Sequence, residues 1–168
     1  MAAVDDIRQL FEEYANDIFR YAKVSLAPSH DPNDAVQEVF YRAFKSWHTF
    51  RGESNPRTWL FTIARNYIFD LQRKTRMSTV LISDTDLSSV TDHRATVDGN
   101  LLIIWEAVAA LKETYRTVVV LRHIEGFTVA ETATILGWSE TKVTTTDHRA
   151  LARLKTLLSN NHEGVVCE

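Results

Sequence analysis

Apolar residues recur at helical spacing along most of the chain, with polar residues in the positions between them. From residue 5 to 26 an apolar residue returns every three or four positions. The same spacing returns at 31–47, 56–74, 101–111, 114–124, 128–136 and 139–158. This period predicts amphipathic helices that bury one face. A short apolar run at 80–82 could be a strand or an apolar anchor.

The apolar stripes predict which side chains form the core. The stripe of the first helix is Ile7, Leu10, Phe11, Tyr14, Ile18, Tyr21 and Ala22, and that of the second is Val36, Val39, Phe40, Ala43, Phe44 and Trp47. We expect these residues to be buried, together with Trp59 in the third helix.

Several helix starts carry a capping residue. Asp31 precedes Pro32 and Asn55 precedes Pro56, an order that suits the first turn of a helix. Asn100 and Thr114 are plausible caps of two later helices.

Residues 77–99 differ in composition from the helical segments around them. Ser, Thr and Asp dominate there and no helical period is present, which is typical of a linker. The sequence therefore predicts an all-α protein of two small helical domains joined by a flexible linker. The domains are residues 5–76 and 100–158, and residues 159–168 are a loose tail.

The segment from Phe127 to Leu158 contains a helix-turn-helix pattern. Thr128 and Glu131 form a capping box, Gly137 fits the left-handed residue that ends a helix, and Ser139 can cap the next one. Two helices joined by so short a turn cross steeply. The C-terminal domain is thus expected to contain a helix-turn-helix, whose shared core is Ala133, Ile135 or Leu136, and Val143.

The second helix of this pattern has a polar outer face. Glu140, Thr141, Thr144, Thr145, His148 and Arg149 lie on or near that side. Such a helix can enter a major groove and contact base edges and phosphates. The alternative is a helical hairpin packed inside a larger bundle, and we favour DNA binding.

Two further polar groups have a structural and a functional interpretation. Asp34, Gln37, Glu38 and Arg42 share one face of the second helix, which is either a solvated surface or a docking face for a protein. Residues 51–76 are locally basic and rich in aromatics, which suits unstacked single-stranded nucleic acid. The alternative places the aromatic side chains of this segment in the core.

Composition excludes several function classes. The 168 residues are 45% hydrophobic and 24% charged, with a formal net charge of −3 and one cysteine, Cys167. A disulfide framework and a cysteine-rich zinc site are excluded. There is no phosphate-binding glycine loop, metal-binding helix or nucleophile elbow, so we expect no enzyme, no metal, no cofactor and no small-molecule substrate. With no membrane-length apolar run and no basic secretory signal, we expect a soluble cytoplasmic protein.

Several motifs together resemble a known family. They are Asp34-x-x-Gln37-Glu38-x-Phe40, Phe50-Arg51-Gly52-Glu53-Ser54, Thr58-Trp59-Leu60-x-x-Ile63-Ala64-Arg65-Asn66, and the helix-turn-helix with His148-Arg149-Ala150 and Leu154. The first three resemble the first conserved domain of extracytoplasmic-function (ECF) sigma factors, and the last resembles their second domain. The match covers the chain from about residue 7 to about 158, apart from the linker.

The resemblance implies an alternative sigma factor that binds core RNA polymerase and directs it to chosen promoters. It implies polymerase docking by Asp34, Gln37, Glu38, Tyr41 and Arg42. It implies melting and recognition of the minus-ten element by Phe50, Arg51, Ser54, Asn55, Arg57, Arg65, Asn66, Arg73 and Lys74. It implies recognition of the minus-thirty-five element by Glu140, Thr141, Lys142, Thr144, Thr145, His148, Arg149 and Arg153. An anti-sigma protein, membrane-anchored in many relatives, is a further expected partner, and the chain would join the nucleoid when active.

The recognition helix departs from the family pattern in one respect. Basic residues are common just after the core valine, whereas Val143 is followed by Thr144, Thr145, Thr146 and Asp147. Phosphate attraction therefore depends on Lys142, Arg149 and Arg153. Two alternative functions are a stand-alone helix-turn-helix regulator and a sigma-like interaction module that does not bind DNA.

Overall fold

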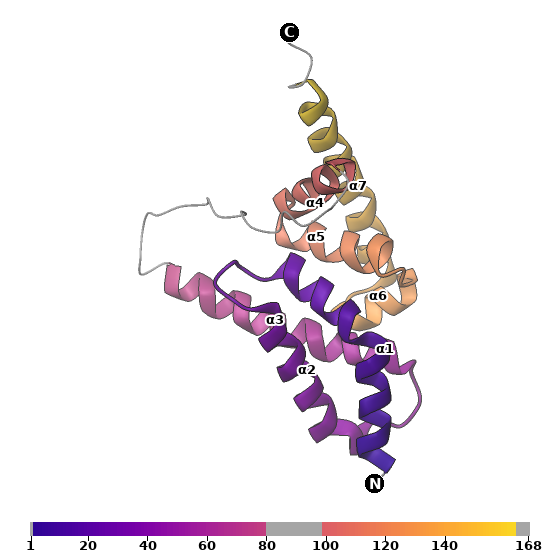
Figure 1. The fold of residues 1–168 in the computed structure, drawn as a ribbon. Helices are drawn as coiled ribbons and strands as arrows, with labels where there is room; N and C mark the ends of the chain where they lie inside the picture. Colours follow the sequence, from indigo (N-terminus) through magenta and orange to yellow (C-terminus); the bar gives the residue numbers. More distant parts are fainter. Residues whose placement is uncertain (1, 80–98, 164–168) are drawn as a thin grey trace. The chain divides into compact units, whose positions relative to one another are not determined.

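The computed structural model describes residues 2–79 and 99–163 (Figure 1). Every regular element in these two ranges is a helix, which confirms the predicted all-α class. The chain divides into two compact units, as expected for two helical domains, and each is described here by itself. The proposed strand at 80–82 and most of the predicted linker lie outside the described residues.

The first unit contains α1 (Ala2–Ser25), α2 (Pro32–Ser46) and α3 (Pro56–Thr79), with a short 3₁₀ turn, η1 (Trp47–Thr49), after α2. Each of the three helices packs on the other two. Their fully buried side chains are Ile18 and Ala22 of α1, Val39 and Ala43 of α2, and Leu60, Phe61 and Ala64 of α3. The rings of Tyr21 and Phe61, with centroids 5.6 Å apart, join α1 to α3 in this core.

Side-chain caps begin α2 and α3 where the sequence predicts them. The Asp31 carboxylate accepts a hydrogen bond from the Asn33 N–H at 2.9 Å, and the Asn55 side-chain oxygen accepts one from the Arg57 N–H at 2.9 Å. Each cap satisfies an N–H group that has no partner within the helix. Both predicted starts are confirmed.

Some predicted core positions are more open than their spacing suggests. Phe44 is 48% exposed and Phe11 is 46% exposed, although the Phe11 ring contacts Phe40 edge-on at 5.0 Å. Trp59 is half-buried. The helical period of the apolar residues correctly predicts which face of each helix is buried. The width of the buried stripe depends on the neighbouring helices that pack against it. Both exposed phenylalanines lie beyond the covered part of their stripe.

The second unit contains α4 (Gly99–Ala110), α5 (Glu113–Val119), a π-helical turn η2 (Val120–Ile124), α6 (Val129–Leu136) and α7 (Glu140–Glu163). Helices α4 and α5 pack on α7. The core of this unit is Ala107, Val108, Leu111, Val118, Val119, Val120, Leu121, Phe127, Val143 and Ala150.

Two predicted caps in this unit are wrong. Asn100 lies inside α4, and Thr114 lies inside α5, whose first turn is closed by a bond from the Arg116 N–H to the Lys112 carbonyl at 2.9 Å. Lys112 is at the N-cap position and makes no side-chain cap. A capping residue type is therefore a weak signal when the neighbouring residues also form helix readily.

Four helix ends extend past the predicted boundaries. Helix α1 begins at Ala2, whereas the sequence predicts a start at residue 5. Helix α3 continues to Thr79 and α4 begins at Gly99, so both ends of the predicted linker are helical. Helix α7 continues to Glu163, so residues 159–163 are helical where a loose tail is predicted.

Candidate functional site

The turn between α6 and α7 is defined by local hydrogen bonds. The Thr128 side-chain oxygen accepts from the Glu131 N–H at 3.1 Å, and the Glu131 carboxylate accepts from the Thr128 N–H at 2.8 Å. These reciprocal bonds confirm the capping box. Gly137 has a φ of +67°, and the Trp138 N–H bonds back to the Ala133 carbonyl at 3.0 Å. This pattern ends α6 as a left-handed glycine does.

Helix α7 starts at the predicted cap and packs through a narrow stripe. The Ser139 hydroxyl accepts from the Lys142 N–H at 3.1 Å. Val143, Thr146 and Ala150 are buried, one helical turn apart. The predicted helix-turn-helix is therefore present, and the residues of its predicted shared core, Ala133, Ile135, Leu136 and Val143, are all buried.

The opposite face of α7 is open. All eight residues predicted to contact the minus-thirty-five element are exposed: Glu140, Thr141, Lys142, Thr144, Thr145, His148, Arg149 and Arg153. Helical spacing arranges them in two adjacent rows. One row contains Glu140, the threonines and His148, and the other contains the cations Lys142, Arg149 and Arg153. Their exposure is confirmed, while their contacts with DNA stay predictions.

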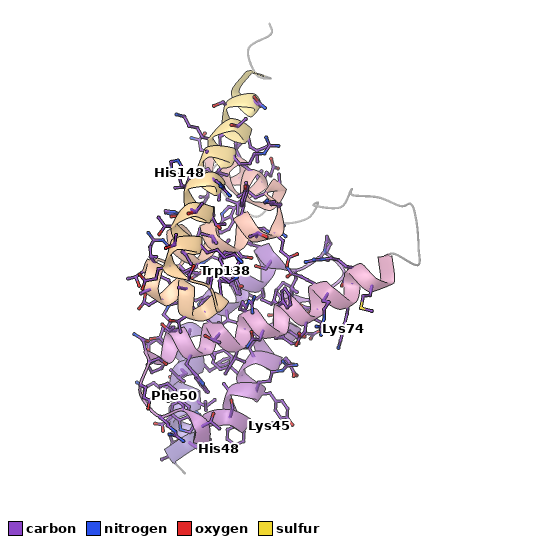
Figure 2. All side chains as sticks on the ribbon, turned by 180° about the vertical axis from the view of Figure 1, so that it is seen from behind. Lys45, His48, Phe50, Lys74, Trp138 and His148 are labelled. Carbon is purple, nitrogen blue, oxygen red and sulfur yellow. The ribbon has the colours of Figure 1, made fainter. Side chains whose placement is uncertain are left out.

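Trp138 orders the start of this surface. The Lys142 ammonium lies 4.1 Å from the centre of the Trp138 ring, within the range of a cation–π contact. Figure 2 shows Trp138 where α6 meets α7 and His148 further along α7. The contact restricts the conformations of the Lys142 side chain, which remains exposed to solvent. This contact is absent from the sequence-based predictions, although the separation of four residues is the spacing of neighbours on a helix.

Asp147 is the one charged residue of the Thr144–Asp147 run, and it does not face solvent. Its side chain is only 13% exposed. One carboxylate oxygen is 2.8 Å from the His123 Nε2, and the other is 3.6 Å from the Arg122 Nε. Both partners belong to η2, more than twenty residues earlier in the chain. No sequence spacing could have predicted this pairing.

On the first unit, the five residues predicted to dock on polymerase lie along one side of α2. Asp34, Gln37 and Tyr41 are exposed, whereas Glu38 and Arg42 are partly exposed and form an ion pair at 2.9 Å. The Arg42 guanidinium also lies 4.9 Å from the centre of the Tyr67 ring of α3. Burial, and next the nearby Glu38 carboxylate, raise the pKa of the Tyr67 hydroxyl, so it stays protonated at neutral pH.

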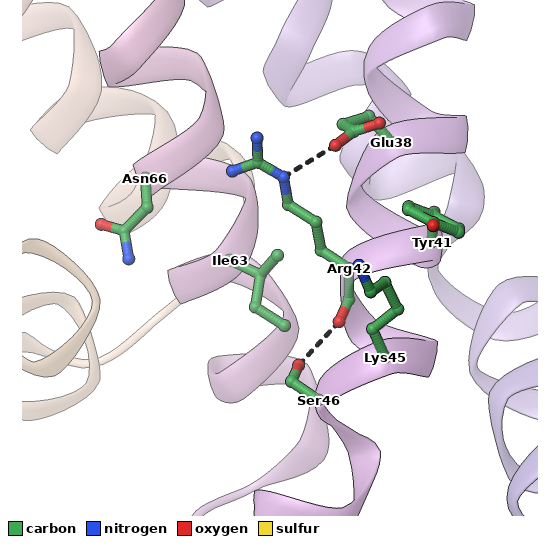
Figure 3. Close-up of a pocket in the computed structure, with 7 residues that line it drawn as sticks. All are labelled: Glu38, Tyr41, Arg42, Lys45, Ser46, Ile63 and Asn66. Carbon is green, nitrogen blue, oxygen red and sulfur yellow. Dashed lines mark hydrogen bonds and ion pairs between the residues drawn. The ribbon is translucent and has the colours of Figure 1, made fainter.

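A shallow hollow of about 510 Å³ lies between α2 and α3 (Figure 3). Glu38, Tyr41, Arg42, Lys45 and Ser46 line it from α2, and Ile63 and Asn66 line it from α3. Three of the predicted docking residues therefore share this hollow with Asn66, which the sequence assigns to the minus-ten group. The two predicted surfaces meet here.

Three aromatic rings pack together at the loop before α3. Phe50 lies 5.1 Å from Trp47 and 5.0 Å from Trp59, measured between ring centroids. Trp47 and Trp59 also contact each other edge to face at 5.6 Å. Phe50 is half-buried, and Figure 2 shows it beside His48 in this loop. Phe50, which the family resemblance assigns to the minus-ten element, thus packs on two rings and keeps part of its surface accessible.

The nine residues predicted for the minus-ten element differ in what they already contact. Arg57 lies 3.6 Å from the Asp17 carboxylate of α1 and stacks on Phe61 at 5.3 Å, and its side chain is 21% exposed. Asn55 uses its side-chain oxygen as the cap of α3. These two residues therefore have structural roles, whatever else they contact.

The other seven are more accessible. Arg65 lies over the exposed Phe69 ring at 4.9 Å and bonds to Asn66 at 3.2 Å, while Arg73 makes a long, exposed ion pair with Asp70 at 3.8 Å. Arg51, Ser54 and Lys74 are exposed and have no charged or hydrogen-bonding partner among the residues that the structure describes. Together with Phe50, they surround the loop and follow one side of α3.

Two further observations concern the described ranges only. In residues 2–79 and 99–163, no three His, Cys, Asp or Glu side chains are grouped where a metal ion could bind. No helix in these ranges has the length and apolar character needed to cross a bilayer.

Comparison with known proteins connects these surfaces to a family. Two family models match the chain: Sigma-70 region 2 at residues 10–77, and Sigma-70, region 4 at residues 101–154. The chain is 34% identical over 155 residues to the ECF RNA polymerase sigma factor SigX of Bacillus subtilis, covering 87% of this chain and 80% of that protein. It is 32% identical over 157 residues to the ECF RNA polymerase sigma factor SigL of Mycobacterium tuberculosis, with coverage of 90% and 88%.

Solved structures agree with these matches. The sigma factor RpoE from Bartonella quintana, crystallised with the anti-sigma factor NepR, aligns with a TM-score of 0.82 at 25% identity, over 92% of this chain and 97% of that one. CnrH, solved in complex with the cytosolic domain of CnrY, aligns with a TM-score of 0.68 at 25% identity, over 92% of this chain and 88% of that one.

Proposed function

The chain belongs to the ECF sigma factors, and we propose that its exposed polar faces divide polymerase docking and promoter recognition between the two helical units. As a sigma factor it binds core RNA polymerase and promoter DNA and directs promoter-specific initiation, and it is not an enzyme. The proposal concerns which residues perform each step.

Polymerase docking is assigned to the side of α2 that carries Asp34, Gln37, Glu38, Tyr41 and Arg42. Three observations support this assignment. The residues lie off the buried stripe, so their side chains are accessible without unfolding. Tyr41 is 56% exposed, so a large aromatic side chain is in contact with solvent and could be covered by a partner. The Glu38–Arg42 pair and the hollow beside it offer both charges and a concave surface to a partner.

Recognition of the melted minus-ten strand is assigned to the loop at 50–55 and to the exposed side of α3. A flipped base needs a pocket or a flat surface to stack on, and Phe50 has an open side and a fixed position. The cations Arg51, Arg65, Arg73 and Lys74 would attract the backbone of the separated strand. Arg57 and Asn55 contribute by holding the loop against α1 and α3.

Recognition of the duplex minus-thirty-five element is assigned to the exposed face of α7. The observation that supports this most strongly is that the turn has helix-turn-helix geometry and that the eight predicted contact residues on its second helix are all exposed. Thr141, Thr144, Thr145 and His148 are suited to base edges, and Lys142, Arg149 and Arg153 to phosphates.

An anti-sigma protein is a proposed partner. The matched structure of RpoE contains a sigma factor in complex with the anti-sigma factor NepR, and that of CnrH contains the cytosolic domain of CnrY. By analogy, we propose that an anti-sigma protein covers the docking or recognition faces of this chain, and that this regulator is membrane-anchored. The sigma factor would then act in the cytoplasm, at the membrane when inhibited and at the nucleoid when released.

Run-off transcription with core polymerase and a library of promoter fragments tests the proposal. We expect selected promoters to share two conserved blocks, one in each element, and transcription to require core polymerase. Duplex binding by the chain without polymerase would instead favour a stand-alone regulator. Polymerase binding without any promoter selection would favour an interaction module.

A further inference from the structure

Asp147 is an acidic residue within the segment of α7 that carries the candidate recognition surface. In the fold its carboxylate is turned away from that surface. The residue lies directly before His148 and one helical turn after Thr144, both of which are exposed. Its own side chain is 13% exposed and turned against η2. A free carboxylate at this position would repel promoter phosphates, since like charges a few ångströms apart interact appreciably even in water.

The contacts of Asp147 come from two adjacent residues of η2. Because a carboxylate only accepts hydrogen bonds, the His123 Nε2–H donates to it, at 2.8 Å. The Arg122 Nε lies 3.6 Å from the other oxygen, an ion pair slightly longer than a hydrogen bond. Arg122 is itself anchored, because its Nη1 donates to the Phe127 carbonyl at 2.6 Å. Arg122, a residue of η2, thus contacts both Phe127, just before α6, and Asp147 of α7.

We propose that Arg122 and His123 neutralise and withdraw the Asp147 carboxylate, so that Glu140 carries the one free negative charge on the stretch of α7 from Glu140 to Arg153. Arg122 supplies the compensating charge and His123 supplies the hydrogen bond. The cations on this stretch of α7 are Lys142, Arg149 and Arg153, which are exposed. Asp147, Arg122 and His123 are positioning residues and do not contact the DNA. This inference rests on the proposed minus-thirty-five role of α7.

The test measures binding of holoenzyme to a duplex promoter fragment that carries the upstream element, at low and high salt. The fragment comes from the run-off selection, and a matched fragment with a scrambled upstream element serves as reference. The variants are Arg122→Met, His123→Ala, Asp147→Asn and the two doubles that combine Asp147→Asn with each of the others. Circular dichroism monitors folding throughout.

We expect Arg122→Met to weaken binding about fivefold at low salt, because it releases an uncompensated charge beside the DNA. The loss should shrink at high salt, where exposed charges are screened. Adding Asp147→Asn should restore most of the affinity, because the amide has no charge to neutralise. A merely structural role of Arg122 would give a loss that Asp147→Asn does not relieve.

Two results would overturn the inference. One is failure of Asp147→Asn to restore binding in a folded double variant, and the other is a several-fold gain from Asp147→Asn alone, which would mean that the carboxylate is already free. If Arg122→Met does not fold, His123→Ala tests the withdrawal of the carboxylate instead, since that side chain is 40% exposed and its removal leaves the core intact. Its loss of affinity should be smaller, because Arg122 remains, and adding Asp147→Asn should again restore binding. If wild-type holoenzyme does not distinguish the two fragments, the minus-thirty-five assignment fails instead.

Discussion

Gly137 adopts a left-handed backbone conformation. Any residue with a side chain would cost free energy in this conformation, whatever its surroundings. The φ of Gly137 is +67°, and a Cβ at this position would meet no atom within 4 Å. The penalty for Gly137→Ala is therefore conformational rather than steric. We expect it to lower the free energy of unfolding by about 1–2 kcal/mol, measured by urea denaturation.

Gly99 offers a matched control for this substitution. A Cβ at Gly99 would likewise meet open space, but the φ of this residue is not in the left-handed region. Gly99→Ala should leave stability unchanged or raise it slightly, because alanine favours the helix. Equal losses from both substitutions would show that the backbone angle at Gly137 is not what matters.

Arg149 is the cation on which we expect upstream-element affinity to depend most. It is exposed, and among the described residues no carboxylate pairs with it, since Asp147 is bound to η2 instead. Arg149→Ala should lower transcription from promoters that need the minus-thirty-five element, and should reduce the salt slope of binding by about 1. Run-off transcription at several ionic strengths measures both effects.

Lys155 provides the comparison for Arg149, because it is an exposed cation further along the same helix. Lys155→Ala should leave promoter selection unchanged, and circular dichroism should not change for either variant. Wild-type transcription by Arg149→Ala at every ionic strength would refute the phosphate contact.

At the scale of helices, α2 presents two faces with different roles. Ala35, Val36, Val39 and Ala43 are buried against α1 and α3, whereas Gln37 is exposed and Glu38 is partly exposed. Removing the two polar side chains together should therefore leave the fold intact and weaken core polymerase binding. Co-purification with core polymerase, quantified for Gln37→Ala with Glu38→Ala, measures the effect.

Helix α1 contains a chemically equivalent pair for comparison. Gln9 and Glu12 are both exposed and lie outside the predicted docking face. The double substitution Gln9→Ala with Glu12→Ala should leave polymerase binding unchanged. Unchanged binding by the α2 double variant would contradict the docking assignment, and equal losses from both pairs would indicate a general effect of surface charge.

The whole molecule has a formal net charge of −3, which is unusual for a protein that binds DNA by itself. The cations are unevenly distributed along the sequence, with groups of them in α3 and in α7. Acidic residues are frequent before α3 and between α3 and α7. Since polymerase contributes much of the binding free energy, a sigma factor needs local basic surfaces rather than a basic total. This distribution agrees with membership of the family.

Composition predicts that the two helical units are separate domains with the boundary at residues 77–99. Limited proteolysis of the whole chain should cut first between the helices, within residues 80–98, because Ser, Thr and Asp dominate there. Mass spectrometry of the first fragments identifies the site. Early cleavage inside α1–α3 or α4–α7, with residues 80–98 intact, would contradict the two-domain organisation.

Local sequence signals alone predict the helices, four of the side-chain caps and the turn of the helix-turn-helix. These features depend on residues within about four positions of one another, such as Thr128 with Glu131, so their partners are visible in the sequence. The family resemblance likewise depends on short motifs. For the same reason, spacing alone correctly predicts the exposed face of α7.

Only the tertiary structure decided which residues meet across the chain. The burial of Asp147 by Arg122 and His123, the ion pair of Arg57 with Asp17, and the exposure of Phe44 all depend on how helices pack. Helical periodicity gives the direction of a side chain around its own axis, but not the neighbour that lies there. The free energy of a charge depends on that neighbour, so the electrostatics of the recognition surface could not be derived from sequence spacing.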